Sequence, residues 1–186
     1  LNISDNKVTG KTLFVLDTDF ASHVMIADNK GQIGIVSLDS NDIEMIDLTT
    51  VDKTRTYKEM HFSDTPIEIL DKTKSSSFAI EMALDAGRII AAADSLGASQ
   101  AMINKAVEYS KERKQFNRVI GSFQAVKHMC AEMAAELEPC YSLVWHAAHC
   151  FDDSSEDARL MACLAKSHIS EVSKMVSKKA TEVHGG

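Results

Sequence analysis

The chain has 186 residues, of which 45% are apolar and 25% charged, a composition that suits one sizeable globular domain or two small ones. Its net charge of −7 excludes a broad electrostatic footprint for nucleic acid, so any anion site must be a local cluster. No apolar run approaches the roughly 20 residues that cross a bilayer, and the first residues lack signal-peptide features, so we expect a cytoplasmic protein without a membrane span.

The first 70 residues predict a set of short strands. Five segments combine β-branched or aromatic residues with flanking turn residues: 12–16, 23–27, 32–38, 54–62 and 67–70. The turn Asp28-Asn29-Lys30-Gly31 separates the second segment from the third, and its residue types accept positive φ angles, so these two strands are expected to form an antiparallel hairpin. We therefore predict an antiparallel sheet or partial barrel, in a domain of residues 1–72.

After residue 72 the apolar residues recur at steps of three, four or seven, which predicts three long helices. They run from about residue 77 to 113, 123 to 151 and 156 to 183, and Pro139 predicts a kink or a local break in the second. The connections at 114–121 and 152–155 are short, so neighbouring helices should be antiparallel. The fold class is therefore α+β, with an up-down helical bundle over residues 73–186. Three such helices usually need a fourth, so a following segment or a neighbouring subunit should complete the bundle.

Neither the cysteines nor the histidines predict a metal site. The four cysteines lie in predicted helices and form no C-x-x-C pair, so they are expected to be reduced thiols: Cys130, Cys140, Cys150 and Cys163. His146, His149 and Cys150 share one helical turn, but the sequence offers no visible fourth ligand for a metal.

The connection between the first two helices carries the strongest functional signal. Cations, aromatic rings and an amide are concentrated in Tyr109–Phe116 (YSKERKQF) and Ser122–Lys127 (SFQAVK), a combination that suits an anion with a planar group attached. This region resembles the signature Y-x-x-x-R-x-Q-F-G-x-x-I-x-x-F-Q of the acyl-CoA dehydrogenase family, flavoenzymes that oxidise acyl-CoA thioesters at Cα and Cβ. The alternative is a solvated basic turn whose phenylalanine covers the helix ends.

The resemblance implies roles for individual residues. Arg113 matches the arginine that contacts the pyrophosphate of FAD across a dimer interface, and Phe116 and Gln124 match residues that line the same cofactor. Asp85 and Arg88 match positions beside the acyl-CoA site. For these two residues the alternative is an ordinary i,i+3 pair on a helix surface.

The last six residues resemble a second element of the family. Thr181–Gly186 (TEVHGG) is similar to Q-x-x-G-G, in which the glycines, here Gly185 and Gly186, let the backbone approach the adenosine end of a neighbour's FAD. Glu182 stands where the family usually has Gln and places an anion near a pyrophosphate. The resemblance therefore implies weaker dinucleotide binding unless Glu182 turns outward.

By resemblance, the complete protein desaturates an acyl-CoA and passes electrons through FAD to an electron-transfer flavoprotein, as a homo- or hetero-oligomer. No catalytic base is assigned, because the family's usual glutamate follows the Q-x-x-G-G element, and Gly87 occupies the position that a minority of members use. The 186 residues alone are therefore expected to be inactive.

Two other functions remain open. Leu16, Glu182 and Gly87 depart from the family pattern where flavin or proton chemistry would select other residues, which favours a non-catalytic partner subunit derived from the same family. The other is a helical bundle with a β extension and no ligand. The sequence also leaves open whether the acyl group is fatty, branched or steroidal.

Overall fold

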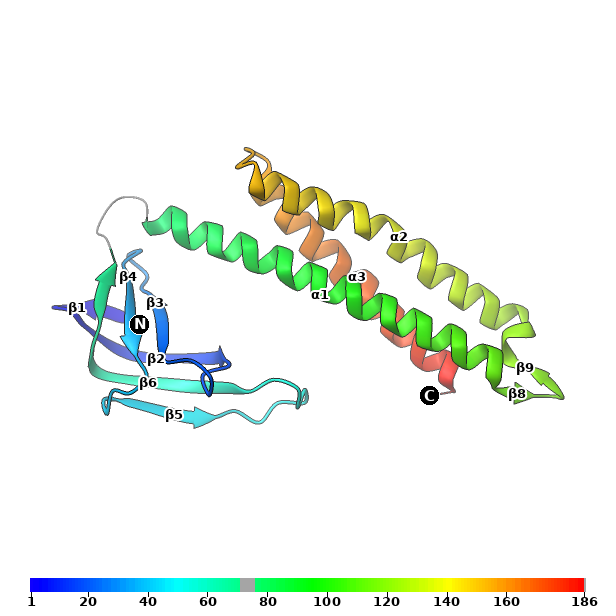
Figure 1. Ribbon diagram of the computed structural model, residues 1–186, viewed down its shortest axis with the longest axis horizontal. Helices are drawn as coiled ribbons and strands as arrows, with labels where there is room; N and C mark the ends of the chain where they lie inside the picture. Colours follow the sequence, from blue (N-terminus) through cyan, green and yellow to red (C-terminus); the bar gives the residue numbers. More distant parts are fainter. Residues whose placement is uncertain (71–75, 186) are drawn as a thin grey trace. The chain divides into compact units, whose positions relative to one another are not determined.

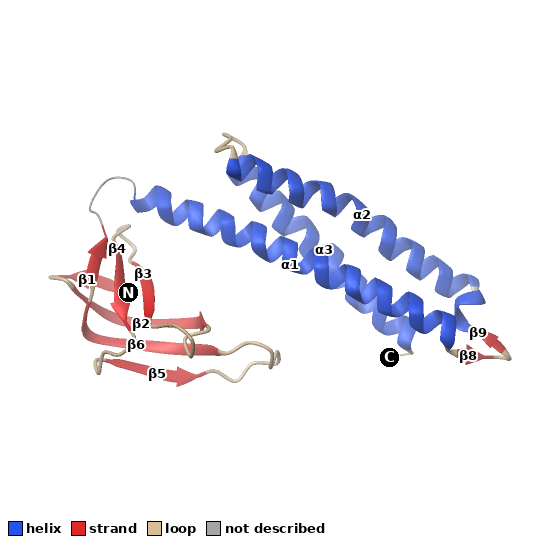
Figure 2. Cartoon of the chain, viewed as in Figure 1, coloured by secondary structure: helices blue, strands red, loops and turns tan. Residues whose placement is uncertain are grey.

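The structure is a computed structural model that describes residues 1–70 and 76–185 (Figure 1). Strands occupy the first part of the chain and long helices the second, so the predicted α+β class is confirmed (Figure 2). The chain divides into two compact units, Leu1–Glu81 and Met82–Gly186. The domain boundary predicted at residues 72–73 lies outside the described residues, as does Gly186.

Two antiparallel sheets form the strand unit. The first has the order β1-β2-β6-β5 and consists of β1 (Asn2–Ser4), β2 (Lys7–Leu16), β6 (Tyr57–Pro66) and β5 (Ile43–Asp47). The second has the order β3-β4-β7 and consists of β3 (His23–Ala27), β4 (Ile33–Ser37) and β7 (Glu68–Leu70). Seven buried apolar side chains form the core of this unit: Ile3, Val8, Ile26, Val36, Met60, Phe62 and Ile67.

The hairpin predicted around Asp28 is confirmed. Strand β3 pairs antiparallel with β4, and the Asp28 carboxylate accepts hydrogen bonds from the backbone N–H groups of Lys30 and Gln32 at 2.8 and 2.9 Å. This side chain therefore holds the turn by satisfying two backbone donors, as aspartate commonly does in turns.

The sequence pattern missed strands β1 and β5, for a physical reason. Both strands lie at the edges of their sheet. Strand β1 has three residues, too few for an alternating pattern to be recognised in the sequence. Four of the five residues of β5 are exposed, so β5 lacks the alternation of buried and exposed residues that makes a strand recognisable.

The three predicted helices are confirmed as α1 (Ser76–Glu112), α2 (Gln124–Asp152) and α3 (Ala158–His184). Helix α2 continues through Pro139, so the local break, one of two outcomes predicted there, does not occur. Pro139 and Ala135 are both exposed, so water can reach the carbonyl that loses its backbone donor. Within the described residues, no helix combines the length and apolarity needed to span a membrane.

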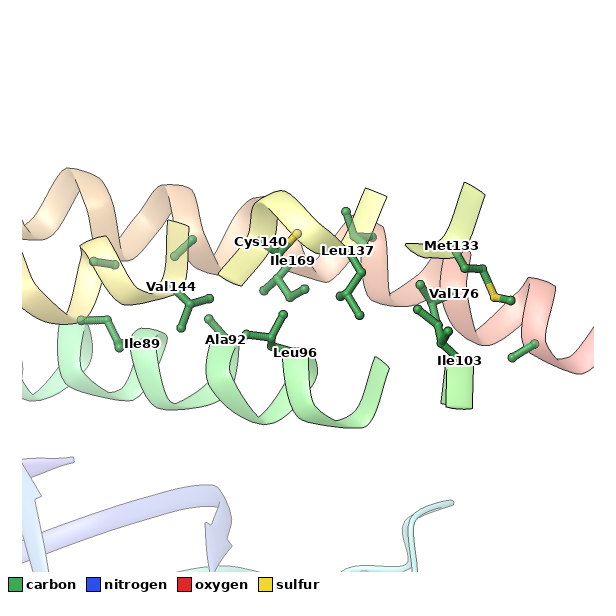
Figure 3. Packing of buried hydrophobic residues seen from close by; sticks show 14 of the residues in the cluster. Ile89, Ala92, Leu96, Ile103, Met133, Leu137, Cys140, Val144, Ile169 and Val176 are labelled. Carbon is green, nitrogen blue, oxygen red and sulfur yellow. The ribbon is translucent and has the colours of Figure 1, made fainter. Parts of the chain in front are cut away.

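The three helices share one hydrophobic core. Ile89, Leu96 and Ile103 of α1 point toward side chains of α2 and α3 (Figure 3). Leu137 of α2 and Ile169 of α3 are 1% and 0% exposed, so the core is closed to water at its centre. Because this packing fixes the helices against one another, it also fixes the ends of α1 and α3, where the candidate site lies.

Candidate functional site

The connection between α1 and α2 is an ordered corner that projects an aromatic ring. It consists of β8 (Lys114–Gln115), β9 (Arg118–Val119) and the short 3-10 helix η1 (Ile120–Ser122). The two residues at the hairpin tip, Phe116 and Asn117, have φ angles of 52° and 61°, as in the type I′ turns of tight hairpins. A positive φ is unusual for a bulky residue, and the Phe116 side chain is 86% exposed. The corner therefore holds this ring outward at a local conformational cost.

Backbone contacts seat the corner against the last turn of α1. The N–H of Arg113 donates to the carbonyl of Tyr109 at 2.9 Å, and the Arg113 carbonyl accepts from the N–H of Ile120 at 2.8 Å. A Cβ atom on Gly121 would lie 2.9 Å from the carbonyl oxygen of Ser110, a buried residue. Only glycine fits this close approach, and as a result the hairpin leaves α1 in a fixed direction.

The two corner arginines have different surroundings. The Arg118 guanidinium carbon lies 3.9 Å from the ring centroid of Phe123, in cation–π geometry. The same ring meets Phe116 edge to face at 6.0 Å. Arg118 therefore supports the aromatic cluster, while Arg113 lines an open pocket beside it.

A second aromatic contact joins the ends of α1 and α3. Tyr109 and His184 stack with ring centroids 4.5 Å apart and an interplanar angle of 28°. The Nδ1 atom of His184 lies 2.7 Å from the carbonyl oxygen of Ala180. Helix α3 ends at His184, and the capping residue Gly185 has a φ of 89°, the left-handed conformation that glycine adopts without strain.

These features enclose a pocket of about 540 Å³ at this end of the bundle. Its lining includes Tyr109, Arg113, Phe116, Val183, His184 and Gly185. The structure thus brings together three predicted cofactor residues, Arg113, Phe116 and Gly185. A guanidinium beside aromatic and aliphatic groups fits a phosphate that carries a planar, partly apolar group, so the residues present suit a dinucleotide.

Two other predicted cofactor residues lie elsewhere. Gln124 is the first residue of α2, and its Nε2 atom lies 3.1 Å from Nε2 of His128. Glu182 lines a separate groove together with Lys174 and Lys178, outside the lining described for the pocket. Glu182 is exposed, and whether it is compatible with a bound dinucleotide stays a prediction.

The predicted substrate residues form a second location on α1. Asp85 and Arg88 make an ion pair in which the Asp85 side chain is 10% exposed and that of Arg88 is 32% exposed. From Arg88 to Glu112 the helix extends about 36 Å, at about 1.5 Å per residue. The two sets of predicted residues are therefore far apart within this chain. Gly87 is exposed, and a Cβ atom there would meet no atom within 4 Å.

Tyr109 and His184 were not among the residues predicted from the sequence to have a role in the site. Both lie within the matched segments, at the first letter of one motif and directly before the glycines of the other, so position within the motifs was the available signal. Burial raises the pKa of the Cys130 and Cys140 thiols, so neither is an activated nucleophile. Across residues 1–70 and 76–185, no group of three or more His, Cys, Asp or Glu side chains is placed to hold a metal ion.

Comparison with known proteins agrees with the family resemblance found in the sequence. A family model described as acyl-CoA dehydrogenase, C-terminal domain, matches residues 78–186. Caffeyl-CoA reductase-Etf complex subunit CarC of Acetobacterium woodii is 32% identical, over 95% of this chain and 42% of its own length. The 3-(aryl)acrylate reductase of Clostridium sporogenes is 31% identical, over 95% of this chain and 43% of its own length. The chain thus spans less than half of either relative.

Solved structures share the fold over nearly the whole chain. Butyryl-CoA dehydrogenase of Megasphaera elsdenii superposes with a TM-score of 0.86 and 26% identity, over 98% of this chain and 52% of its own. A chain in the structure of the electron transferring flavoprotein of Acidaminococcus fermentans gives a TM-score of 0.88 and 28% identity, over 99% of this chain and 52% of its own.

Proposed function

This chain belongs to the acyl-CoA dehydrogenase family, and we propose that the full-length protein is a flavoenzyme that interconverts an acyl-CoA and its α,β-unsaturated form. Electrons would pass through FAD to an electron-transfer flavoprotein. The name of the Acetobacterium woodii relative, which places that protein in a complex with Etf, supports this partner. Fatty, branched and steroidal acyl groups are candidate substrates, and the names of two relatives, a caffeyl-CoA reductase and a 3-(aryl)acrylate reductase, add aromatic acyl groups.

The observation that carries the proposal is the pocket shared by Arg113, Phe116 and Gly185. The Arg113 guanidinium would pair with phosphate oxygens of FAD, the Phe116 ring would cover an adjacent apolar part, and Gly185 would let backbone approach without a Cβ in the way. Bound FAD would supply the hydride acceptor. The role of these residues is therefore to bind and orient the cofactor.

The distance between the two sets of residues supports a shared site. Arg88 lies about 36 Å along α1 from its C-terminal end, and Asp85 lies three residues farther, so we propose that this pair serves the substrate of one active site and the Arg113 corner the cofactor of another. This arrangement requires a second subunit beside the corner. A homo- or hetero-oligomer, either dimer or tetramer, is therefore part of the proposal.

The direction of the reaction is open to experiment. Two relatives are named as reductases, and a third, from Megasphaera elsdenii, is named as a short-chain acyl-CoA dehydrogenase with 35% identity over 69% of this chain. Saturated acyl-CoA should therefore be tested on the oxidised full-length protein, and 2-enoyl-CoA on the reduced protein. Rapid reaction with one of the two would establish the preferred direction.

Flavin absorbance of the purified full-length protein tests the proposal. We expect visible flavin bands that bleach when a suitable acyl-CoA is added without oxygen. Arg113→Ala should lose most of the bound flavin, whereas Lys105→Ala, which removes an exposed cation elsewhere on α1, should keep it. A colourless protein that neither takes up added FAD nor reacts with any acyl-CoA would contradict the proposal.

A second candidate function is a non-catalytic subunit that pairs with an active member of the family. It is favoured by Gly87, which offers no acid at the position used as base by a minority of members, and by the carboxylate of Glu182. Co-expression with related subunits, followed by measurement of flavin per chain, separates the two functions. One flavin per chain in a self-associated protein would exclude the second function.

A further inference from the structure

We propose that a second pocket beside the corner binds a small carboxylate with an apolar chain. This pocket has a volume of about 460 Å³ and lies where the end of α1, the corner and the start of α2 meet. Cavities of about 300–1,000 Å³ with a mostly apolar lining and a few polar groups are typical of small-molecule sites. Among the described residues, Val126 alone lines both this pocket and the pocket of Arg113, so the two sites are separate. Such a ligand is additional to the proposed function, and its binding does not depend on flavin.

Valine side chains from three elements form the apolar part of the pocket. Val107 belongs to α1, Val119 to β9 and Val126 to α2, and each is partly buried. Gly121, which also lines the pocket, makes the close backbone contact with Ser110 that leaves no room for a Cβ atom. This contact holds the corner against α1, so the apolar walls keep fixed positions and the pocket belongs to the packed fold.

The two serines of the lining have no hydrogen to offer a ligand. The Ser110 hydroxyl donates to the carbonyl of Val107 at 2.7 Å, and the Ser122 hydroxyl donates to the carbonyl of Val119 at 2.7 Å. Because a hydroxyl has one hydrogen, both oxygens can serve a ligand only as acceptors. The strong side-chain donors of this pocket are therefore its two lysine ammonium groups.

The charge of the pocket is positive. Lys111 of α1 and Lys127 of α2 line it, and among the described residues its lining includes no aspartate or glutamate. The Lys111 ammonium contacts Glu108 at 2.6 Å, but both side chains are exposed and such pairs contribute little, so a ligand carboxylate can compete for the lysine. Lysine stems lie along apolar surface while the ammonium groups stay in water. The two cations therefore suit an anionic head group, and the valines suit an apolar chain.

Cys130 provides a natural reporter of ligand binding. It lines the pocket and is partly buried, whereas Cys163, on α3, is exposed and lies outside the lining described for the pocket. Burial raises the pKa of the Cys130 thiol, so alkylation is best measured at about pH 8.5, where more of the thiol is ionised. A ligand in the pocket should cover Cys130 and leave Cys163 open to the reagent.

Alkylation of the full-length protein with iodoacetamide, mapped by mass spectrometry, tests the proposal with octanoate as the probe. At about ten times its Kd, octanoate should slow the modification of Cys130 about tenfold and leave the rate at Cys163 unchanged. Saturating FAD should not prevent this protection. Octanol, which has the same chain without the charge, should need an about fivefold higher concentration. Octylammonium, whose charge the lysines repel, should give no protection.

Lysine variants identify the groups that bind the carboxylate. Lys111→Gln and Lys127→Gln should each weaken the protection by octanoate about threefold to fivefold. Lys105→Gln, at an exposed lysine of α1 outside the described lining, is the matched control and should keep it. Equal protection by octanol and octanoate, or unchanged protection in the double lysine variant, would overturn the proposal. So would a Cys130 that stays unmodified without ligand while Cys163 reacts completely, because another segment or subunit would then cover the pocket.

Discussion

The backbone of Gly121 touches that of Ser110 so closely that a Cβ atom on Gly121 would lie 2.9 Å from the Ser110 carbonyl oxygen. The atom in the way belongs to the backbone of α1, next to the buried face of the helix, so it cannot rotate aside as a side chain would. This contact joins the corner to the helix. Because a Cβ atom would not fit there, the direction of the Phe116 hairpin depends on residue 121 being glycine.

Gly121→Ala should therefore separate the corner from α1. Forcing one carbon into a packed backbone contact typically costs about 1–3 kcal/mol, and we expect a loss of this size in the free energy of unfolding. Chemical denaturation of this chain measures it. Unchanged stability would mean that the corner can move away from α1 without loss.

Gly87→Ala is the change to compare with Gly121→Ala, because Gly87 has open space where a Cβ atom would be added. A Cβ atom there would meet no atom within 4 Å, and the residue lies inside α1, where glycine costs helix stability relative to alanine. We expect the free energy of unfolding of this chain to rise by about 0.5–1 kcal/mol. A decrease in the same denaturation experiment would show that the position is packed in solution.

A charged cluster on the first sheet should give the strand unit a pH-dependent stability. Glu59 receives hydrogen bonds from His61 at 2.6 Å and from Lys11 at 3.3 Å, and these contacts lower its pKa below the ordinary value of 4.5. A carboxyl group with a lowered pKa in the folded state stabilises the fold above its ordinary pKa, and this stabilisation is lost as the pH falls through the folded value.

Glu59→Gln should therefore lower stability at neutral pH, and the difference from the wild type should shrink as the pH falls below 4.5. Denaturation at a series of pH values measures that difference. Lys30→Gln, at an exposed lysine in the β3–β4 turn, is the control and should show little change with pH. A difference that grows on acidification would contradict the assignment of this stabilisation to Glu59.

Much of the architecture could be predicted because its signal is periodic. Ile89, Leu96 and Ile103 repeat along α1 at helical spacing, and each is buried in the bundle core. The edge strand β5 could not be found in this way, because four of its five residues are exposed. Edge strands are formed by pairing with a neighbour, here β6, and leave little trace in the pattern of apolar residues.

The features of the candidate site also fall into two groups, those that could be predicted from the sequence and those that only the folded structure reveals. Arg113 and Phe116 could be identified because they stand together in one motif, in the connection between two predicted helices. The stack of Tyr109 on His184 could not, since it joins residues from the ends of α1 and α3 and exists only once the bundle has packed. The positive φ of Phe116 was also hidden, because Phe-Asn is not among the dipeptides that usually indicate a type I′ turn.

A stability measurement can distinguish two interpretations of the Asp85–Arg88 pair. The pair lies beside the acyl-CoA site, or it is an ordinary i,i+3 pair on the helix surface. An ordinary exposed i,i+3 pair contributes a few tenths of a kcal/mol. Here the Asp85 side chain is 10% exposed, and Arg88 is the cation that compensates its charge. Arg88→Met would leave a largely buried carboxylate without this partner, which should cost about 1–3 kcal/mol in the free energy of unfolding.

The matched change is Asp85→Asn, which keeps the shape of the side chain and removes its charge. If the cost of Arg88→Met comes from the unpaired carboxylate, the double variant should recover a large part of it, with a coupling energy of about 1 kcal/mol or more in a double-mutant cycle. Coupling near zero would assign Asp85 and Arg88 to the ordinary surface pair. Strong coupling would show that α1 keeps a charged pair in a largely buried setting, as expected of residues retained beside a polar ligand.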